Sequence, residues 1–152
     1  SRTDWCSNNN LACIGAIYYN TNYISTQKSV YYNYFTATAG HNTLNNIVPG
    51  GDLCPSGWRL PTIAEYQALG TALDLSNNYQ LYLAAPTLLT YTGYYKSDSN
   101  TLSYTGSQGH LWTRNPYSAY AAYSSQIYIN SNGIATAALD KTHGLPIRCI
   151  QK

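Results

Sequence analysis

Four cysteines place the strongest constraint on how this chain of 152 residues can fold. They are Cys6, Cys13, Cys54 and Cys149, and four cysteines allow three ways of pairing. The short spacing at the start favours a local Cys6–Cys13 loop, which leaves Cys54 to pair with Cys149. That second bridge closes a loop of about 95 residues, worth about 4–5 kcal/mol in the chain-entropy model. A zinc site is less favoured, because no CxxC pair occurs and the histidines lie far from the cysteines.

The cysteines also bear on where the protein works and how it is organised. Disulfides persist in oxidising compartments, so we expect an extracellular or cell-surface location. The length predicts one domain over residues 1–152, with a polar cysteine loop at 1–14. No run of 18 apolar residues and no signal peptide occur, so no membrane insertion is expected of this piece. Because the first residue is Ser1, we expect an anchor or another domain upstream of the cysteine loop.

The composition favours recognition by hydrogen bonding and aromatic contact rather than by charge. Only 9% of the residues are charged, the net charge is +2, and 17 residues are tyrosine. The basic residues are scattered, which argues against a nucleic-acid partner, since such proteins cluster Lys and Arg. Surfaces rich in Tyr, Ser and Asn are typical of binding proteins.

One helix can be predicted from its start signal within GGDLCPSGWRLPTIAEYQAL, residues 50–69. Thr62 and Glu65 form a T-x-x-E capping box, so the helix is expected to begin at Ile63. The following apolar residues recur at near-helical spacing and predict one buried face.

The remaining pattern predicts a second helix and several strands. The second helix is expected at 77–85, before Pro86. Asn132-Gly133 is a strong hairpin signal, and a long polar loop is expected at 96–109. The strands are expected at 15–20, 88–95, 110–114, 120–130, 133–139 and 144–150, with 30–35 a further strand or the start of a helix. Helices combined with antiparallel hairpins indicate an α+β domain.

Four segments resemble a known family in order and spacing. They are CPSGWRLPT-x-x-E-Y-x-x-L (54–69), GYY (93–95), LWTR (111–114) and G-x-P-I-R-C-I (144–150). Together they resemble the Fibrobacter succinogenes major paralogous domain over roughly residues 15–150. The resemblance implies a disulfide-stapled, C-type-lectin-like α+β fold with two helices and antiparallel strands, found on bacterial surface proteins.

The same resemblance implies roles for residues of the corner around Cys54. It implies that this segment lies near the last strand, with Trp58 and Leu60 in the core and Arg59 paired with a carboxylate such as Glu65 or capping loop carbonyls. The segment is therefore interpreted as a structural corner rather than a catalytic centre. One departure is Trp112-Thr113-Arg114-Asn115, where many members carry W-S-S-T, and this change bears on what is bound.

Motifs for catalysis or metal binding are not found. The sugar-binding motifs of calcium-dependent C-type lectins do not occur, and the acidic residues are dispersed. Asp98-Ser99-Asn100 could form a weak calcium site, although a solvated turn is the preferred interpretation. His41, His110 and His143 each lie beside a glycine, and no phosphate loop, dinucleotide fingerprint or nucleophile elbow occurs. We therefore expect no enzyme activity, no cofactor and no resident metal.

The predicted binding surface lies in residues 112–130, with the 96–109 loop beside it. Its candidate residues are Trp112, Arg114, Asn115, Tyr117, Tyr120 and Tyr123. Tyrosine offers a large, stiff contact area and a hydroxyl at small entropic cost. Alternate residues of this stretch are expected to face the core, so about half of its tyrosines are expected to be buried.

The expected function is ligand binding or adhesion by non-covalent contact with a protein or glycan on another cell or in the matrix. A Tyr-Ser-Asn-rich surface is also compatible with diversification by a retroelement that mutates adenines. Two alternatives stay open: a self-assembling subunit or decoration of a pilus or surface layer, and an enzyme acting on polysaccharide.

Overall fold

The described part of the chain combines two short helices with antiparallel strands, in agreement with the mixed class expected from the sequence. The structure is a computed structural model that describes residues 17–19, 29–40, 48–72, 89–128 and 133–152. The helices are α1 (Tyr34–Ala37) and α2 (Ile63–Ala72), and the strands are β1 (Ile17–Tyr19), β2 (Val30–Tyr32), β3 (Trp58–Arg59), β4 (Tyr94–Lys96), β5 (Thr101–Ser103), β6 (Gln108–Pro116), β7 (Ala121–Tyr128), β8 (Ala135–Asp140) and β9 (Ile150–Gln151). No described helix is long and apolar enough to cross a membrane.

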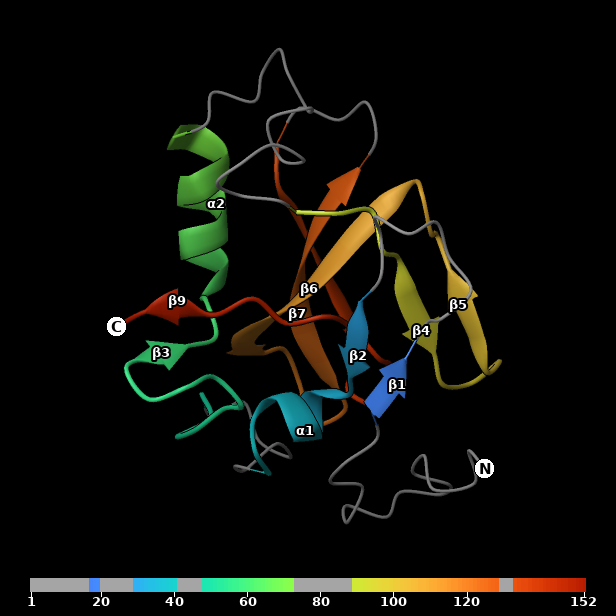
Figure 1. Cartoon of the computed structure of the whole chain (residues 1–152), viewed down its shortest axis with the longest axis horizontal. Helices are drawn as coiled ribbons and strands as arrows, with labels where there is room; N and C mark the ends of the chain where they lie inside the picture. The colour runs from blue at the N-terminus through green and yellow to red at the C-terminus, as the bar shows by residue number, and fades with distance from the viewer. Residues whose placement is uncertain (1–16, 20–28, 41–47, 73–88, 129–132) are drawn as a thin grey trace.

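An antiparallel sheet in the order β6-β7-β8 forms the centre of this arrangement (Figure 1). Figure 1 shows α2 on one side of the sheet and the β4–β5 hairpin on the other. The predicted hairpin of β7 and β8 is confirmed, since Ala121 pairs with Asp140 and Gln126 pairs with Ala135. Its turn at 129–132 lies outside the described residues. Ala122 and Ser124 face the core while Tyr123 is only partly buried, as the period of two requires.

The predicted start of α2 is confirmed. Glu65 N–H donates to Thr62 Oγ1 at 3.2 Å, and Thr62 N–H donates to Glu65 Oε2 at 2.8 Å, which completes the capping box. Arg59 forms an ion pair with Glu65, also as expected. The predicted helix at 77–85 lies outside the described residues. The segment 30–35 contains both expected possibilities, because β2 is followed by α1 with Asn33 as its N-cap.

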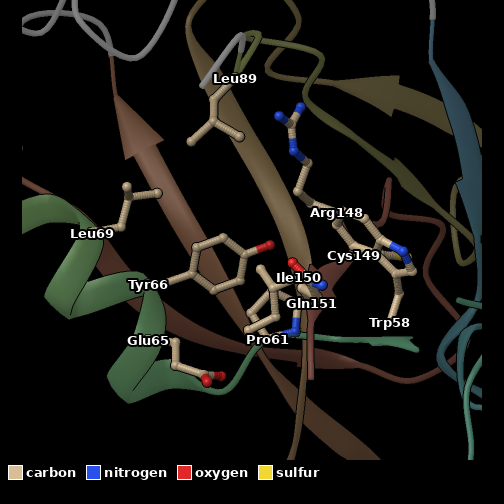
Figure 2. Close-up of a pocket in the computed structure, with 10 residues that line it drawn as sticks. All are labelled: Trp58, Pro61, Glu65, Tyr66, Leu69, Leu89, Arg148, Cys149, Ile150 and Gln151. Atoms are coloured by element: carbon tan, nitrogen blue, oxygen red, sulfur yellow. The ribbon is translucent and has the colours of Figure 1, made fainter. Parts of the chain in front are cut away.

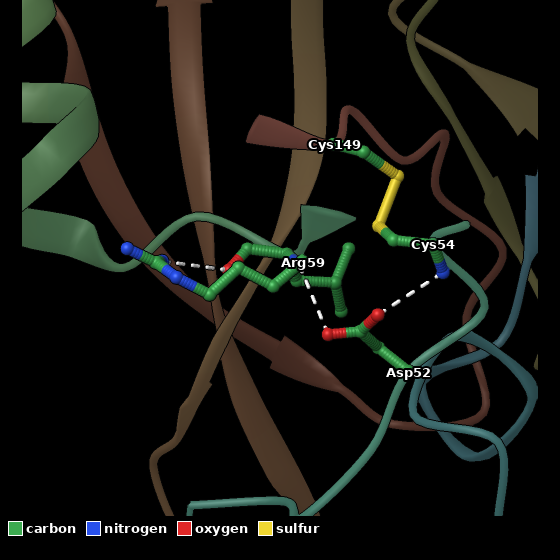
Figure 3. The surroundings of a disulfide bond; sticks show 5 residues. Asp52, Cys54, Arg59 and Cys149 are labelled. Atoms are coloured by element: carbon green, nitrogen blue, oxygen red, sulfur yellow. Dashed lines mark hydrogen bonds between the residues drawn. A yellow bond between two sulfur atoms is a disulfide. The ribbon is translucent and has the colours of Figure 1, made fainter. Parts of the chain in front are cut away.

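The Cys54–Cys149 disulfide is present, as the sequence predicted, with the two Cα atoms 5.8 Å apart (Figure 3). It lies beside the short antiparallel pair β3–β9, so the corner segment around Cys54 lies against the last strand, β9. Asp52 organises the corner, since its carboxylate accepts the backbone N–H of Cys54 and of Leu60, each at 3.0 Å. Cys6 and Cys13 lie outside the described residues.

Two predicted segments differ from the structure. The predicted strand at 144–150 is wrong, because only β9 at Ile150–Gln151 is regular. Gly144 instead bridges to Tyr95 and Leu145 bridges to Tyr32, so the hydrogen bonds of this segment go to several elements rather than to one neighbouring strand.

The predicted loop at 96–109 is also wrong, because β4 and β5 form a hairpin there and β6 begins at Gln108. The predicted strand at 88–95 starts only at Tyr94, after Gly93. At Gly93 φ is +66°, and an added Cβ would lie 2.1 Å from Ser103 O. Glycine is therefore required at this corner.

The main core forms around Trp112, Tyr34, Leu60 and Leu145, none of which is exposed. The rings of Tyr34 and Trp112 meet edge to face with centroids 5.2 Å apart, a favoured aromatic geometry. Leu60 is in the core as expected. The expectation for Trp58 is wrong, because 44% of this residue is exposed on β3.

Candidate functional site

The predicted tyrosine surface is built on the tight turn at residues 117–120, called here the tyrosine turn, which joins β6 to β7. Tyr120 is 73% exposed and Tyr117 is 52% exposed. The backbone N–H groups of Tyr117 and Ser118 both donate to Ala121 O at 3.0 Å. Ser118 Oγ accepts the backbone N–H of Tyr120 at 3.2 Å and of Ala121 at 3.0 Å. The turn is thus closed by its own hydrogen bonds, and its two tyrosines project from it.

A buried lysine that sequence reasoning missed fixes this turn to the body of the fold. Lys141 has no exposed surface, and its Nζ donates to Ser118 O at 2.7 Å and to Ala119 O at 3.2 Å. Its backbone N–H also donates to Tyr120 O at 2.8 Å. The ammonium lies 5.6 Å from the centre of the Tyr34 ring, within cation–π range. Burial lowers the pKa of Lys141, yet the main-chain carbonyls and the ring give the charged form favourable partners.

Tyr123 belongs to the same surface. Its ring meets the ring of Tyr117 edge to face, with centroids 5.1 Å apart. This contact limits the rotamers of Tyr117 and leaves Tyr120 the most exposed of the three. The structure therefore places Tyr117 and Tyr123 in direct contact, and Tyr120 lies in the same turn as Tyr117.

Arg114 and Asn115 are partly buried and serve the framework. Arg114 Nη2 donates to Pro49 O at 3.1 Å and thereby holds the loop that precedes the Cys54 corner. Asn115 Oδ1 accepts the backbone N–H of Ile63 at 3.0 Å, which satisfies one of the free donors at the start of α2. Both side chains are therefore engaged in holding other elements in place.

Trp112 cannot contact a ligand in this structure. The residue has no exposed surface, and its Nε1–H donates to Tyr32 O at 2.7 Å inside the core. Its assignment to the binding surface is therefore corrected, and the physical reason is that the indole packs in the main core against Tyr34.

The first part of the 96–109 segment lies near the tyrosine turn, because Ser97 Oγ is 2.7 Å from Thr142 Oγ1 and the neighbouring Lys141 donates to Tyr120 O. The last part leads into the start of β6, whereas the turn follows the end of this nine-residue strand. Tyr104 is 47% exposed there, has a φ of 62°, and stacks on Tyr94 with ring centroids 5.8 Å apart. Tyr104 and Tyr94 therefore form an aromatic surface near the start of β6.

A serine and a histidine meet near the same hairpin. Ser97 Oγ lies 3.0 Å from His143 Nδ1 and 2.7 Å from Thr142 Oγ1. Ser97 N–H also points at His143 Nδ1 at 3.3 Å, so that nitrogen acts as an acceptor and the contact ties two loops together. Among the described contacts, the other ring nitrogen has no carboxylate partner of the kind a catalytic triad uses. Within the described residues no group of three or more His, Cys, Asp or Glu is placed to hold a metal ion.

A pocket of about 360 Å³ lies between α2 and the β3–β9 pair, close to the disulfide (Figure 2). Its lining combines the exposed ring of Trp58 with aliphatic side chains from α2 and from the segment before β4. Glu65 is at its edge, where hydrogen bonds from Arg59 hold the pKa of the carboxyl at about 2. Sequence reasoning missed this pocket, because its lining comes from three separated segments.

Comparison with known proteins gives one match. The model of the family described as the Fibrobacter succinogenes major domain matches residues 2–151. No curated protein and no solved structure matches the chain.

Proposed function

The chain belongs to the Fibrobacter succinogenes major domain family, and from this membership and the tyrosine turn we propose that it is an extracellular recognition domain of a bacterial surface protein. It binds a protein or glycan ligand without covalent chemistry. We further propose that its fold is C-type-lectin-like, a class in which binding through loops at one end is common.

The observation that carries this proposal is the rigid display of tyrosine at residues 117–120. Two exposed tyrosines stand on a turn whose carbonyls are bonded to a lysine with no exposed surface. A ligand that meets a preformed turn does not have to order it, so less of the interaction energy is lost to conformational entropy. Tyrosine then contributes apolar area and a hydroxyl from a side chain with few rotatable bonds.

The extracellular assignment is supported by the disulfide. The Cys54–Cys149 bridge closes the fold and would be kept reduced in a typical cytosol. The low charge of the chain fits a surface that recognises partners by hydrogen bonds and aromatic packing.

The direct test is binding of the purified chain to a glycan array and to extracts of surface proteins, with and without a calcium chelator. For each ligand found, the double variant Tyr117→Ala/Tyr120→Ala is expected to bind at least about tenfold more weakly, since two exposed aromatic contacts are lost. The matched control is Tyr104→Ala, which removes a tyrosine of similar exposure at the other end of β6. Equal losses in both variants would place the binding surface elsewhere.

A second prediction concerns the lysine under the turn. Lys141→Met keeps most of the apolar volume and removes the bonds to Ser118 O and Ala119 O. We expect weaker ligand binding with both tyrosines intact, and a loss of about 1–3 kcal/mol in the free energy of unfolding, because carbonyls are left without a donor. The measurements are binding titration and urea unfolding.

The control for this prediction is Lys96→Met, which removes the same charge near Tyr104. If Lys141→Met binds and unfolds like the unaltered chain, the turn does not depend on the lysine.

A further inference from the structure

The pocket beside the disulfide has the size and walls of a small-molecule site. Its volume of about 360 Å³ lies in the range of ligand pockets. Most of its lining is apolar, and it comes from Trp58, Pro61, Leu69, Leu89 and Ile150. Such walls favour an apolar body over a sugar or a phosphate, because they offer few partners for hydroxyl groups.

Trp58 provides a ready surface for a flat ring. It lies on β3 with 44% of its surface exposed, although a residue of this size and type is usually well buried. Figure 2 shows its indole at one side of the pocket, across from Tyr66 on α2. A ring placed between them would bury the exposed indole face, which is favourable in proportion to the apolar area removed from water.

The donor that the pocket offers is Arg148, whose side chain is part of the lining. The Tyr66 hydroxyl also keeps its proton, because burial raises the pKa of Tyr66. Its oxygen is fully buried, however, and Ser125 is near enough to influence its pKa, so the ring of Tyr66 and not its hydroxyl forms part of the pocket wall.

The one carboxylate in the lining is already occupied. Glu65 Oε2 accepts from Arg59 Nη1 at 2.8 Å, from Thr62 N–H at 2.8 Å and from Thr62 Oγ1 at 2.9 Å. Its other oxygen accepts from Arg59 Nη2. Glu65 is therefore neutralised by its own ion pair and does not offset the charge of Arg148, which makes its own contacts within the protein.

We propose that this pocket binds an acid with a ring-sized apolar body, with the ring against Trp58 and the carboxylate facing Arg148. This site is separate from the tyrosine turn. The same chemistry is present in a free aromatic acid and in the last residue of a peptide that ends in phenylalanine, and the test separates these two sources.

The experiment is titration calorimetry of the full chain with 3-phenylpropionate, 3-phenylpropanamide and propionate. The phenyl acid is expected to bind saturably, the neutral amide at least about tenfold more weakly, and propionate not measurably, since each lacks one half of the recognised group. A short peptide ending in phenylalanine is compared with its amidated form. Tighter binding of the peptide acid than of 3-phenylpropionate assigns the site to peptide ends, and the reverse order assigns it to free acids.

The variants test each contact while the fold is kept. Trp58→Ala is expected to abolish binding of 3-phenylpropionate, and Arg148→Gln to weaken it about tenfold. Tyr66→Phe retains the buried ring and is expected to bind 3-phenylpropionate as the unaltered chain does, because the hydroxyl is fully buried. Lys96→Gln is the control, because it removes an equal charge far from this pocket and is expected to change nothing.

Two results would overturn the proposal. One is saturable binding that is equal for the acid and the amide, and the other is no saturable binding of any probe that carries a ring. The outcome is independent of the tyrosine turn, because Tyr117→Ala/Tyr120→Ala is expected to bind 3-phenylpropionate as the unaltered chain does.

Discussion

At the scale of single residues, His110 is a titratable group that the fold keeps out of water. The residue is 1% exposed, and its ring meets that of Tyr94 at 4.8 Å. Nε2 lies 2.9 Å from Gln108 Oε1, and Nδ1 lies 3.4 Å from Gln126 Nε2. One nitrogen therefore donates and the other accepts, which suits the neutral ring. Burial lowers the pKa of His110 to about 4.

This pKa predicts a loss of stability in mild acid. Between pH 6.5 and about 4 the unfolded chain binds a proton that folded His110 does not, so the free energy of unfolding falls as the pH falls. The loss approaches about 3 kcal/mol when the whole interval is crossed. His110→Gln is expected to remove that part of the pH dependence, as measured by urea unfolding at pH 7 and pH 4.5. The prediction would be contradicted if the free energy of unfolding fell by the same amount in both proteins between pH 7 and pH 4.5.

At the scale of elements, α2 depends on a local signal that can be tested alone. Thr62→Ala removes the acceptor for Glu65 N–H and is expected to cost about 1 kcal/mol of stability, as for other N-cap threonines. Thr71→Ala is the matched control, because Thr71 is exposed on the same helix and its hydroxyl donates to the Gln67 carbonyl instead of capping the helix. Thermal unfolding of the two variants gives the comparison, and an equal change in both would remove the capping box as the cause.

The elements that could be predicted are those specified by neighbours in sequence. The capping box gave the start of α2, and alternation with Asn132-Gly133 gave the β7–β8 hairpin. The prediction of a strand at 144–150 was wrong because the hydrogen-bond partners of this segment are distributed over distant elements. The prediction that Trp58 is buried in the core was wrong, because the hydrophobicity of this residue does not reveal that it lies on the short β3–β9 pair.

The candidate site followed the same rule. Tyr117, Tyr120 and Tyr123 could be proposed from composition, but the side chains that face inward or cap other elements, Trp112 and Asn115, could not be separated from them. The role of Lys141 depends on a contact across 22 and 23 positions in the chain, for which the sequence carries no local pattern.

At the scale of the whole molecule, the last described segment connects parts of the fold that are far apart in sequence. Leu145 pairs with Tyr32, Gly144 pairs with Tyr95, and Pro146 O accepts the backbone N–H of Trp112 at 3.1 Å. Cys149 then bonds to Cys54. Contacts of this kind are lost together when the chain opens, so the disulfide is expected to affect the stability of the fold as a whole.

The variant Cys54→Ala/Cys149→Ala tests this expectation. Opening a cross-link with a sequence separation of 95 is expected to lower the free energy of unfolding by about 4–5 kcal/mol, because the unfolded chain gains freedom. The measurement is guanidinium unfolding of the variant and of the oxidised chain. An unchanged midpoint would show that the non-covalent contacts of the last segment are sufficient.

The way Lys141 holds the tyrosine turn has a consequence for how the protein can evolve. Its ammonium binds main-chain oxygens, which every amino acid provides, and Tyr120 is held there by its own main-chain oxygen. Only Ser118 uses its side chain to close the turn. Substitutions at 117, 119 and 120 therefore alter what the turn presents and leave its scaffold in place, so new specificities are accessible without a new fold.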